Sequence, residues 1–128
     1  MLKLLFICDA GVRRSPTAAE LFADRAETRF RGVRAAAIGA ANLVPELADH
    51  QLEGDDFRWA DRIFCMDKRN EVHIRQLFGK LSYEKKIAVL GVPDRFVKND
   101  PRLKAAFESL AEYIVGDKDP DYMPLIFR

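Results

Sequence analysis

The residue types that could do chemistry gather near the N-terminus, in the stretch ICDAGVRRSPT. Cys8 ends a run of apolar residues, and Arg14 and Ser15 follow it closely. A cysteine thiolate is a nucleophile, an arginine guanidinium can grip two oxygens of a phosphate, and a hydroxyl can hydrogen-bond a sulfur atom. This combination indicates a cysteine that attacks or carries a phosphoryl group, whereas a lone cysteine at a strand end would more often be structural.

The loop between Cys8 and Ser15 suits an anion. Ser15 is a good N-cap and Pro16 fits a first helical position, so we expect a helix to begin there. Its unpaired N–H groups and positive dipole end attract an anion. Gly11 permits a left-handed backbone that turns successive N–H groups inward. The same groups would stabilise a thiolate at Cys8 and make it nucleophilic near neutral pH.

The elements that must position this loop alternate between strands and helices. Short apolar runs predict strands at residues 2–8, 33–38, 62–66 and 86–92, and period-3.6 spacing predicts helices at 15–30, 67–78 and 101–114, with 41–54 a short helix or loop. This alternation predicts a three-layer α/β/α fold with a four-stranded parallel sheet and a phosphate-binding loop after the first strand. Ligands bind beyond the carboxyl ends of such strands, so we expect the site at that edge.

Composition narrows the class of protein. The chain has 128 residues, which predicts a single domain over 1–128, and a net charge of +1, which favours neither nucleic acid nor a membrane surface as a partner. No apolar run is long enough for a membrane span, and Cys8-Asp9 interrupts what could resemble a signal peptide, so we expect a cytoplasmic protein. Cysteine and histidine spacing suggests no metal, and we expect no cofactor. Cys65 lies in an apolar run and is expected to be a buried, inert thiol.

The segment CDAGVRRSPTAAE resembles the signature of the low-molecular-weight protein tyrosine phosphatases, Cys-x5-Arg-Ser/Thr after the first strand. The segment WADRIFCM, at residues 59–66, is similar to the third strand of that family. The resemblance implies a phosphatase with Cys8 as nucleophile, Arg14 as the phosphate-binding arginine and Ser15 as the hydroxyl assisting the thiolate. It also implies a backbone phosphate cradle made of Asp9, Ala10, Gly11, Val12, Arg13 and Arg14. The substrate would be a phosphotyrosine protein or a small aryl phosphate.

Three loop residues depart from the family pattern. Gly11 stands where the family usually has Asn, and Arg13 stands where it often has a second cysteine. Asp9 places a negative charge beside the nucleophile, which would oppose the thiolate if its side chain pointed inward. The chain is also shorter than the usual enzyme and looks most like a small, divergent bacterial branch of the family.

A phosphatase of this kind needs a carboxylic acid to protonate the leaving group, and three candidates exist. Asp94, in VPDRF, lies just beyond the fourth predicted strand and is favoured by that placement. Asp100 precedes a proline, as in the family, but capping of the last helix explains this residue fully. Asp119, in DPDY, looks most like the family's Asp-Pro-aromatic motif.

Other residues near this edge have structural explanations beside functional ones. Phe96 would either stack on a substrate ring or anchor its loop in the core. We expect packing for Trp59, helix capping for Asp67, and solvated or capping positions for His50 and His73. The apolar tail, residues 117–128, is expected to pack on the body or on a partner, giving a monomer or a weak dimer.

Besides a phosphatase, three other functions are considered at this point. The loop also looks like the Cys-x-Ala-Gly loop of sugar-phosphotransferase IIB domains, in which a cysteine carries phosphate between proteins; Arg14 and an acid favour hydrolysis over carriage. Thioredoxin-coupled arsenate reductases resemble the loop too, but they need further cysteines, and Cys65 would be a poor relay partner. An inactive phosphate-binding module is the third reading, because of Gly11 and Asp9.

Overall fold

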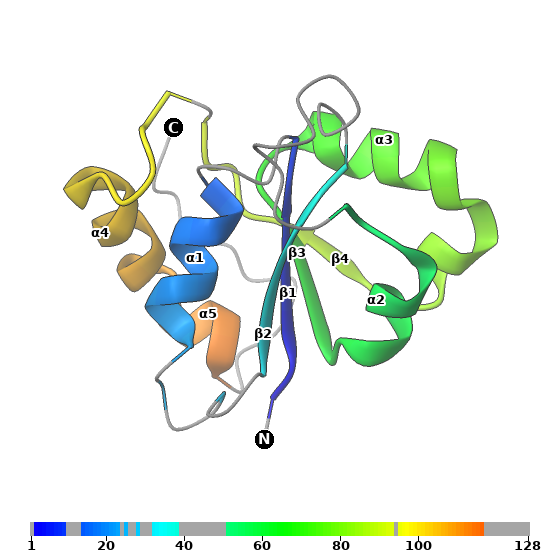
Figure 1. Ribbon diagram of the computed structural model, residues 1–128, viewed down its shortest axis with the longest axis horizontal. Helices are drawn as coiled ribbons and strands as arrows, with labels where there is room; N and C mark the ends of the chain where they lie inside the picture. The colour runs from blue at the N-terminus through cyan, green and yellow to red at the C-terminus, as the bar shows by residue number, and fades with distance from the viewer. Residues whose placement is uncertain are drawn as a thin grey trace.

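A parallel sheet of four strands lies at the centre of the fold, with helices on both faces (Figure 1). The computed structural model describes residues 2–9, 14–23, 25, 28, 32–38, 51–93 and 95–116. The strand order is β2-β1-β3-β4, with every pair parallel. The strands are β1 (Leu4–Cys8), β2 (Val33–Ala37), β3 (Arg62–Cys65) and β4 (Ile87–Val89). The predicted three-layer α/β/α class is therefore confirmed.

The helices divide between the two faces of the sheet (Figure 1). One face carries α1 (Arg14–Phe22), α4 (Pro101–Ser109) and α5 (Ala111–Val115). The other carries α2 (Gly54–Trp59), α3 (Lys68–Phe78) and the 3₁₀ helix η3 (Gly79–Tyr83). Within the described residues, none of the helices has the length and apolar character that crossing a bilayer requires.

Strand β1 explains why both layers form. All five of its residues are buried, and successive side chains of a strand point to opposite faces. Leu4, Phe6 and Cys8 join the core under α1, α4 and α5, while Leu5 and Ile7 join the core under α2 and α3. A continuous apolar run is what a central parallel strand needs, because helices cover it on both sides.

The ladder continues past the strand ends at the carboxyl edge. The N–H of Met66 donates to the carbonyl of Ile7 at 3.2 Å, and the N–H of Val92 donates to the carbonyl of Met66 at 2.8 Å. These bonds hold the segments after β1, β3 and β4 next to one another. Backbone hydrogen bonds therefore hold together the edge of the sheet at which the site is predicted.

Two predicted helices differ from the structure. Helix α1 ends at Phe22 rather than at residue 30, because its last carbonyl accepts from the N–H of Arg25 and from the hydroxyl of Thr28. The predicted last helix breaks at Leu110. The N–H of Leu110 donates to the carbonyls of Ala106 and Phe107, and the hydroxyl of Ser109 donates to the carbonyl of Ala105, one turn earlier. The short helix α2 was not predicted. Most of the uncertain segment 41–54, and the tail 117–128, lie outside the described residues.

An aromatic group fills the core beneath α1 and α4. The ring of Phe6 lies 5.7 Å from that of Phe22, 5.5 Å from that of Phe64 and 6.4 Å from that of Phe107. Phe6 is fully buried, so its removal would leave a cavity between the sheet and both helices.

We predict that Phe6→Ala lowers the free energy of unfolding by about 3–5 kcal/mol, because it removes a buried ring and leaves that cavity. Urea unfolding followed by circular dichroism would measure the loss. The control is Leu77→Ala, since Leu77 is 59% exposed and its truncation should stay within about 0.5 kcal/mol. Equal losses in the two variants would contradict the central place given to Phe6.

Candidate active site

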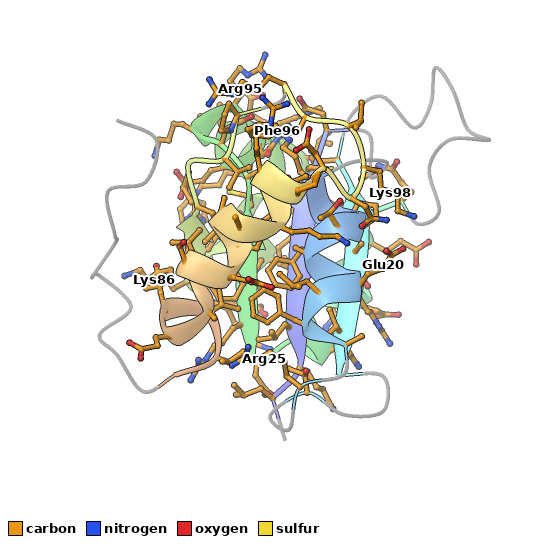
Figure 2. The ribbon with its side chains drawn as sticks, turned by 90° about the vertical axis from the view of Figure 1, so that its left-hand side faces the viewer. Glu20, Arg25, Lys86, Arg95, Phe96 and Lys98 are labelled. Carbon is orange, nitrogen blue, oxygen red and sulfur yellow. The ribbon has the colours of Figure 1, made fainter. Side chains whose placement is uncertain are left out.

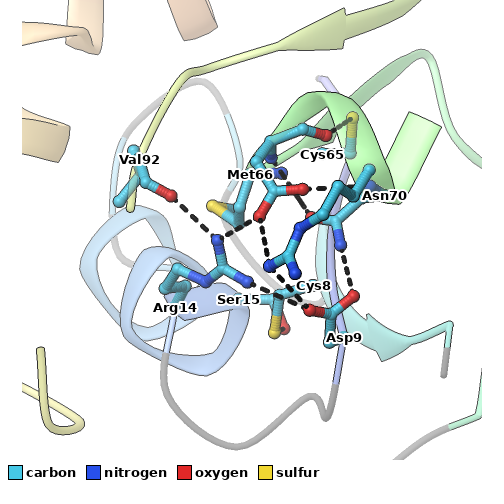
Figure 3. Close-up of polar contacts among 10 residues, drawn as sticks. Cys8, Asp9, Arg14, Ser15, Cys65, Met66, Asn70 and Val92 are labelled. Atoms are coloured by element: carbon cyan, nitrogen blue, oxygen red, sulfur yellow. Dashed lines mark hydrogen bonds and ion pairs between the residues drawn. The ribbon is translucent and has the colours of Figure 1, made fainter. Parts of the chain in front are cut away.

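The nucleophile candidate lies at the carboxyl end of β1. Cys8 is buried, and its sulfur lies 3.0 Å from the hydroxyl oxygen of Ser15, which is also buried (Figure 3). Helix α1 begins at Arg14, so Ser15 and Pro16 are its second and third residues and the predicted N-cap role of Ser15 is wrong. Ser15 thus lies inside the first turn of α1, with its hydroxyl within hydrogen-bond distance of the sulfur. Pro16 is tolerated there because the first N–H groups of a helix have no partner within the helix.

Arg14 is the largest fully buried side chain at this edge, with 1% of its surface exposed. Its Nη1 donates to Oδ2 of Asp67 at 2.9 Å and to the carbonyl oxygen of Val92 at 2.8 Å (Figure 3). A buried guanidinium needs such partners, since an unpaired buried charge costs several kcal/mol. These two bonds fix the plane of the guanidinium against the segments that follow β3 and β4.

Asp67 has two roles at once. It caps α3, as predicted, because its side chain accepts from the N–H of Asn70 at 3.0 Å, and it also pairs with Arg14. Partial burial opposes its ionisation, but the hydrogen bonds from Arg14 and Asn70 and the charges of Arg14 and Arg69 outweigh this and lower the pKa of Asp67. Asp67 is therefore a carboxylate, suited to orienting Arg14 rather than to donating a proton.

Asp9 is turned toward α3 and Arg14. Its Oδ1 accepts from Nδ2 of Asn70 at 2.7 Å, and its Oδ2 lies 3.8 Å from Nη2 of Arg14 (Figure 3). The exposed guanidinium of Arg69 lies 3.6 Å from Asp9 and 3.7 Å from Asp67. The four charged groups thus form a closed ring of alternating sign. The charge of Asp9 is offset by two guanidinium groups beside the nucleophile.

Asn70 was missed by the sequence reasoning. It is fully buried, its Oδ1 accepts from the N–H groups of Met66 and Asp67 at 3.2 Å each, and its Nδ2 reaches Asp9. The spacing Asp67-x-x-Asn70 is that of a capping box, which could have drawn attention to it. The carbonyl of Val92 carried no sequence signal, because it is a backbone group brought close by the sheet.

Cys65 does not belong to this chemistry. It is buried on the opposite face of the sheet from Cys8, and burial, with smaller contributions from Glu71 and Asp67, raises the pKa of Cys65 to about 12. A thiol with that pKa is protonated near neutral pH and is therefore a poor nucleophile. The predicted burial of this thiol is confirmed, and its raised pKa agrees with the expected low reactivity.

Comparison with known proteins finds similar structures but no similar sequence. Neither a protein-family model nor a curated protein sequence matches this chain. The low-molecular-weight protein tyrosine phosphatase SP-PTP from Streptococcus pyogenes is 18% identical, over 95% of this chain and 97% of that one, with a TM-score of 0.66. The tyrosine phosphatase Wzb from Escherichia coli K30, solved with phosphate, is 17% identical over 88% and 93%, with a TM-score of 0.60. The YwlE arginine phosphatase from Geobacillus stearothermophilus is 20% identical over 86% of each chain, with a TM-score of 0.55.

The chain has the fold of the low-molecular-weight protein tyrosine phosphatases. The strand order 2-1-3-4 and the helices on both faces agree with this, and the resemblance inferred from CDAGVRRSPTAAE is confirmed at the level of fold. A shared fold at these identities does not establish a shared reaction, so the chemistry has to be argued from the side chains.

Of the three candidates for the general acid, the structure describes only Asp100. Asp94 and Asp119 lie outside the described residues. Asp100 caps α4, accepting from the N–H of Arg102 at 2.8 Å, and hydrogen bonds from the side chain and backbone of Arg102 lower its pKa. Capping thus accounts for Asp100, as the alternative explanation predicted. The cradle residues Ala10, Gly11, Val12 and Arg13 also lie outside the described residues.

The segment before α4 is fastened to α1. Phe96 is 3% exposed and belongs to the core, so it anchors this segment rather than presenting its ring to a substrate. The N–H of Asn99 donates to the hydroxyl of Thr17 at 2.9 Å, and Lys98 pairs with Glu20 at 2.9 Å (Figure 2). These contacts hold the chain beyond residue 94 against the helix that carries Arg14.

Three side chains discussed from the sequence lie away from Cys8. Trp59 packs against the core under α2 and α3 with Arg34 over its ring at 4.0 Å, which confirms a packing role. His73 lines a cavity of about 260 Å³ on the outer side of α3, and His50 lies outside the described residues. The other described residues lining this cavity are Lys68, Arg69, Val72 and Gln76. Cys8 does not line this cavity. Arg69 does, and it also belongs to the ring of charged groups formed with Asp9, Arg14 and Asp67.

We predict that the stability contributed by Asp67 depends on pH with a definite sign. Because the folded-state pKa of Asp67 is lowered from an ordinary value of 3.8, its stabilisation is present above that value and is lost as pH falls through the folded-state pKa. The free energy of unfolding of Asp67→Asn, measured by urea unfolding, should therefore fall furthest below that of the wild type at neutral pH, with the gap closing below about pH 4.

Asp55→Asn is the control for that experiment, since the Asp55 side chain is 87% exposed and pairs with an exposed arginine. Such a pair contributes little to stability, so its removal should change unfolding only slightly. A gap between wild type and Asp67→Asn that stays constant from neutral pH to about pH 3 would contradict the ionised role of Asp67.

Proposed function

We propose that the chain is a cysteine-dependent phosphatase that acts through a phosphocysteine on Cys8. The observation that carries the proposal is the 3.0 Å contact between the Cys8 sulfur and the Ser15 hydroxyl, at the sheet edge where the buried Arg14 is fixed. The nucleophile Cys8 ends β1, and the cation of Arg14 and the hydroxyl of Ser15 lie at the start of α1. All three groups therefore belong to one strand–loop–helix unit. The phosphatase fold supports the same conclusion.

In the first step, the Cys8 thiolate attacks phosphorus. A sulfur–phosphorus bond forms, the bond from phosphorus to the leaving oxygen breaks, and its electron pair goes to that oxygen, which takes a proton from the acid. Arg14 and the N–H groups of residues 9–14 would stabilise the charge on the transferring phosphoryl oxygens. We assign the acid to Asp94, the residue favoured by its place beyond β4.

In the second step, water attacks the phosphocysteine. The sulfur–phosphorus bond breaks, inorganic phosphate leaves, and the proton of the water goes to the carboxylate formed in the first step. The sulfur leaves as a thiolate, and the Ser15 hydroxyl can donate a hydrogen bond to it. This contact favours hydrolysis over stable carriage of the phosphoryl group, because it makes the sulfur a better leaving group.

The substrate class that follows from the family resemblance is phosphotyrosine or a small aryl phosphate. One solved relative is an arginine phosphatase, so phosphoarginine is a second substrate to test. A single domain over residues 1–128, acting in the cytoplasm as a monomer or weak dimer, is the form we propose for the enzyme.

We predict that the protein hydrolyses p-nitrophenyl phosphate with a rapid initial burst and is inhibited by vanadate. Cys8→Ser should lose roughly 10⁴-fold or more in kcat, because it removes the nucleophile of both steps. Cys65→Ala is the matched control and should keep its turnover, since that thiol lies on the other face of the sheet.

The alternatives give other outcomes in the same assay. A phosphocysteine that persists for minutes and passes its phosphoryl group to a sugar would identify a carrier. Binding of phosphate without turnover would identify an inactive module. Turnover that survives in Cys8→Ser would exclude the mechanism.

We predict that Asp94→Asn slows substrates with poor leaving groups more than those with good ones. The loss should reach about 10²–10⁴-fold for a phenyl phosphate, whose leaving oxygen needs the proton, and be smaller for p-nitrophenyl phosphate. Asp100→Asn is the control, because its carboxylate caps α4. The same leaving-group pattern in Asp119→Asn, and its absence in Asp94→Asn, would move the acid to Asp119.

A further inference from the structure

The guanidinium of Arg69 lies between two carboxylates at the active site. Its Nη2 is 3.6 Å from Oδ2 of Asp9 and 3.7 Å from Oδ2 of Asp67. Both distances exceed those of a hydrogen bond, and the side chain is 77% exposed. Ion pairs of this kind contribute little to stability, so Arg69 can leave this position at low cost.

The position of Asp9 is fixed independently of Arg69. Because Oδ1 of Asn70 accepts from two backbone N–H groups, its Nδ2 must face the other way, and there it donates to Oδ1 of Asp9 at 2.7 Å. Asn70 is itself fully buried. The carboxylate of Asp9 is thus held by a rigid partner with its Oδ2 turned toward the two arginines.

For a phosphatase, a carboxylate at this place is a disadvantage with ordinary substrates. Oδ2 of Asp9 lies 3.8 Å from Nη2 of the phosphate-gripping Arg14, where it repels a dianionic phosphate and competes for the same cation. Asp67 already supplies the carboxylate that orients Arg14, at 2.9 Å. Arg14 and Arg69 offset the charge of Asp9 in the free protein, and this second carboxylate is an advantage when the substrate itself brings a positive charge.

We propose that Asp9 is a specificity-determining residue that selects phosphoryl groups carried by a cationic side chain, with phosphoarginine as the substrate class. This inference rests on the proposed phosphatase function. The guanidinium of the substrate takes the place of Arg69 between Asp9 and Asp67, while its phosphoryl group lies against Cys8 and Arg14. Arg69 is then an internal competitor that occupies the cation position when no substrate is bound.

The chemical step follows the phosphatase mechanism with nitrogen as the leaving atom. The Cys8 thiolate forms a sulfur–phosphorus bond, the phosphorus–nitrogen bond breaks, and its electron pair goes to nitrogen, which takes one proton from the acid. Water then releases inorganic phosphate and regenerates the thiolate. The arginine leaves as a guanidinium ion, and both carboxylates stabilise its charge.

The test compares kcat/KM for phosphoarginine and for p-nitrophenyl phosphate in the full chain. Asp9→Asn keeps an oxygen for the hydrogen bond from Asn70 and removes only the charge. We expect it to lower the ratio of phosphoarginine to p-nitrophenyl phosphate on the order of tenfold, the effect of about one close ion pair. Arg69→Gln should raise the same ratio, because it removes the competitor.

Lys68→Gln is the matched control, since it removes a neighbouring cation of α3 that pairs with Glu71 outside the charged ring. Its ratio should equal that of the wild type. A ratio unchanged in Asp9→Asn, or p-nitrophenyl phosphate turnover with no action on phosphoarginine, would overturn the inference and leave the phosphatase function standing. Turnover of both substrates by Cys8→Ser would instead overturn the proposed function.

Discussion

The buried guanidinium of Arg14 is the constraint on which the rest of this edge depends. A charge that is 1% exposed must have partners inside the protein, and Asp67 and Val92 supply them. Those partners follow β3 and β4, whereas Arg14 begins the helix that follows β1. Satisfying one cation therefore requires three strands of the sheet to end at the same place. The strand order places β1 beside β3 and β3 beside β4, which brings these partners within reach.

Much of this arrangement could be predicted from local sequence. The apolar run of β1 predicts a central strand, because strand burial depends on neighbouring residues, whereas α1 begins at Arg14, before the N-cap predicted at Ser15. The anion site expected in the loop from Cys8 to Ser15 stays a prediction. The cap at Asp67 and the cap at Asp100 followed from residue type and spacing alone.

Other parts depend on contacts between distant residues, which a single sequence does not reveal. Asn70 and Asp9 are 61 residues apart, and Arg14 and Val92 are 78 apart, yet each pair forms a close hydrogen bond. The end of α1 was also misjudged, because a hydroxyl and an N–H from the following turn satisfy its last carbonyl. The first two contacts join segments that only the fold brings together, whereas the contact that ends α1 is local and breaks a helical pattern that the apolar spacing continues.

The placement of the two cysteines on opposite faces of the sheet has a consequence for recovery from peroxide damage. Cys8 points into one core and Cys65 into the other, so the sheet itself separates their sulfur atoms, and the sequence contains no further cysteine. A sulfenic acid on Cys8 has no thiol of its own chain to condense with. Its rescue is a bimolecular reaction with an outside thiol, and the rate of reactivation rises with the concentration of that thiol.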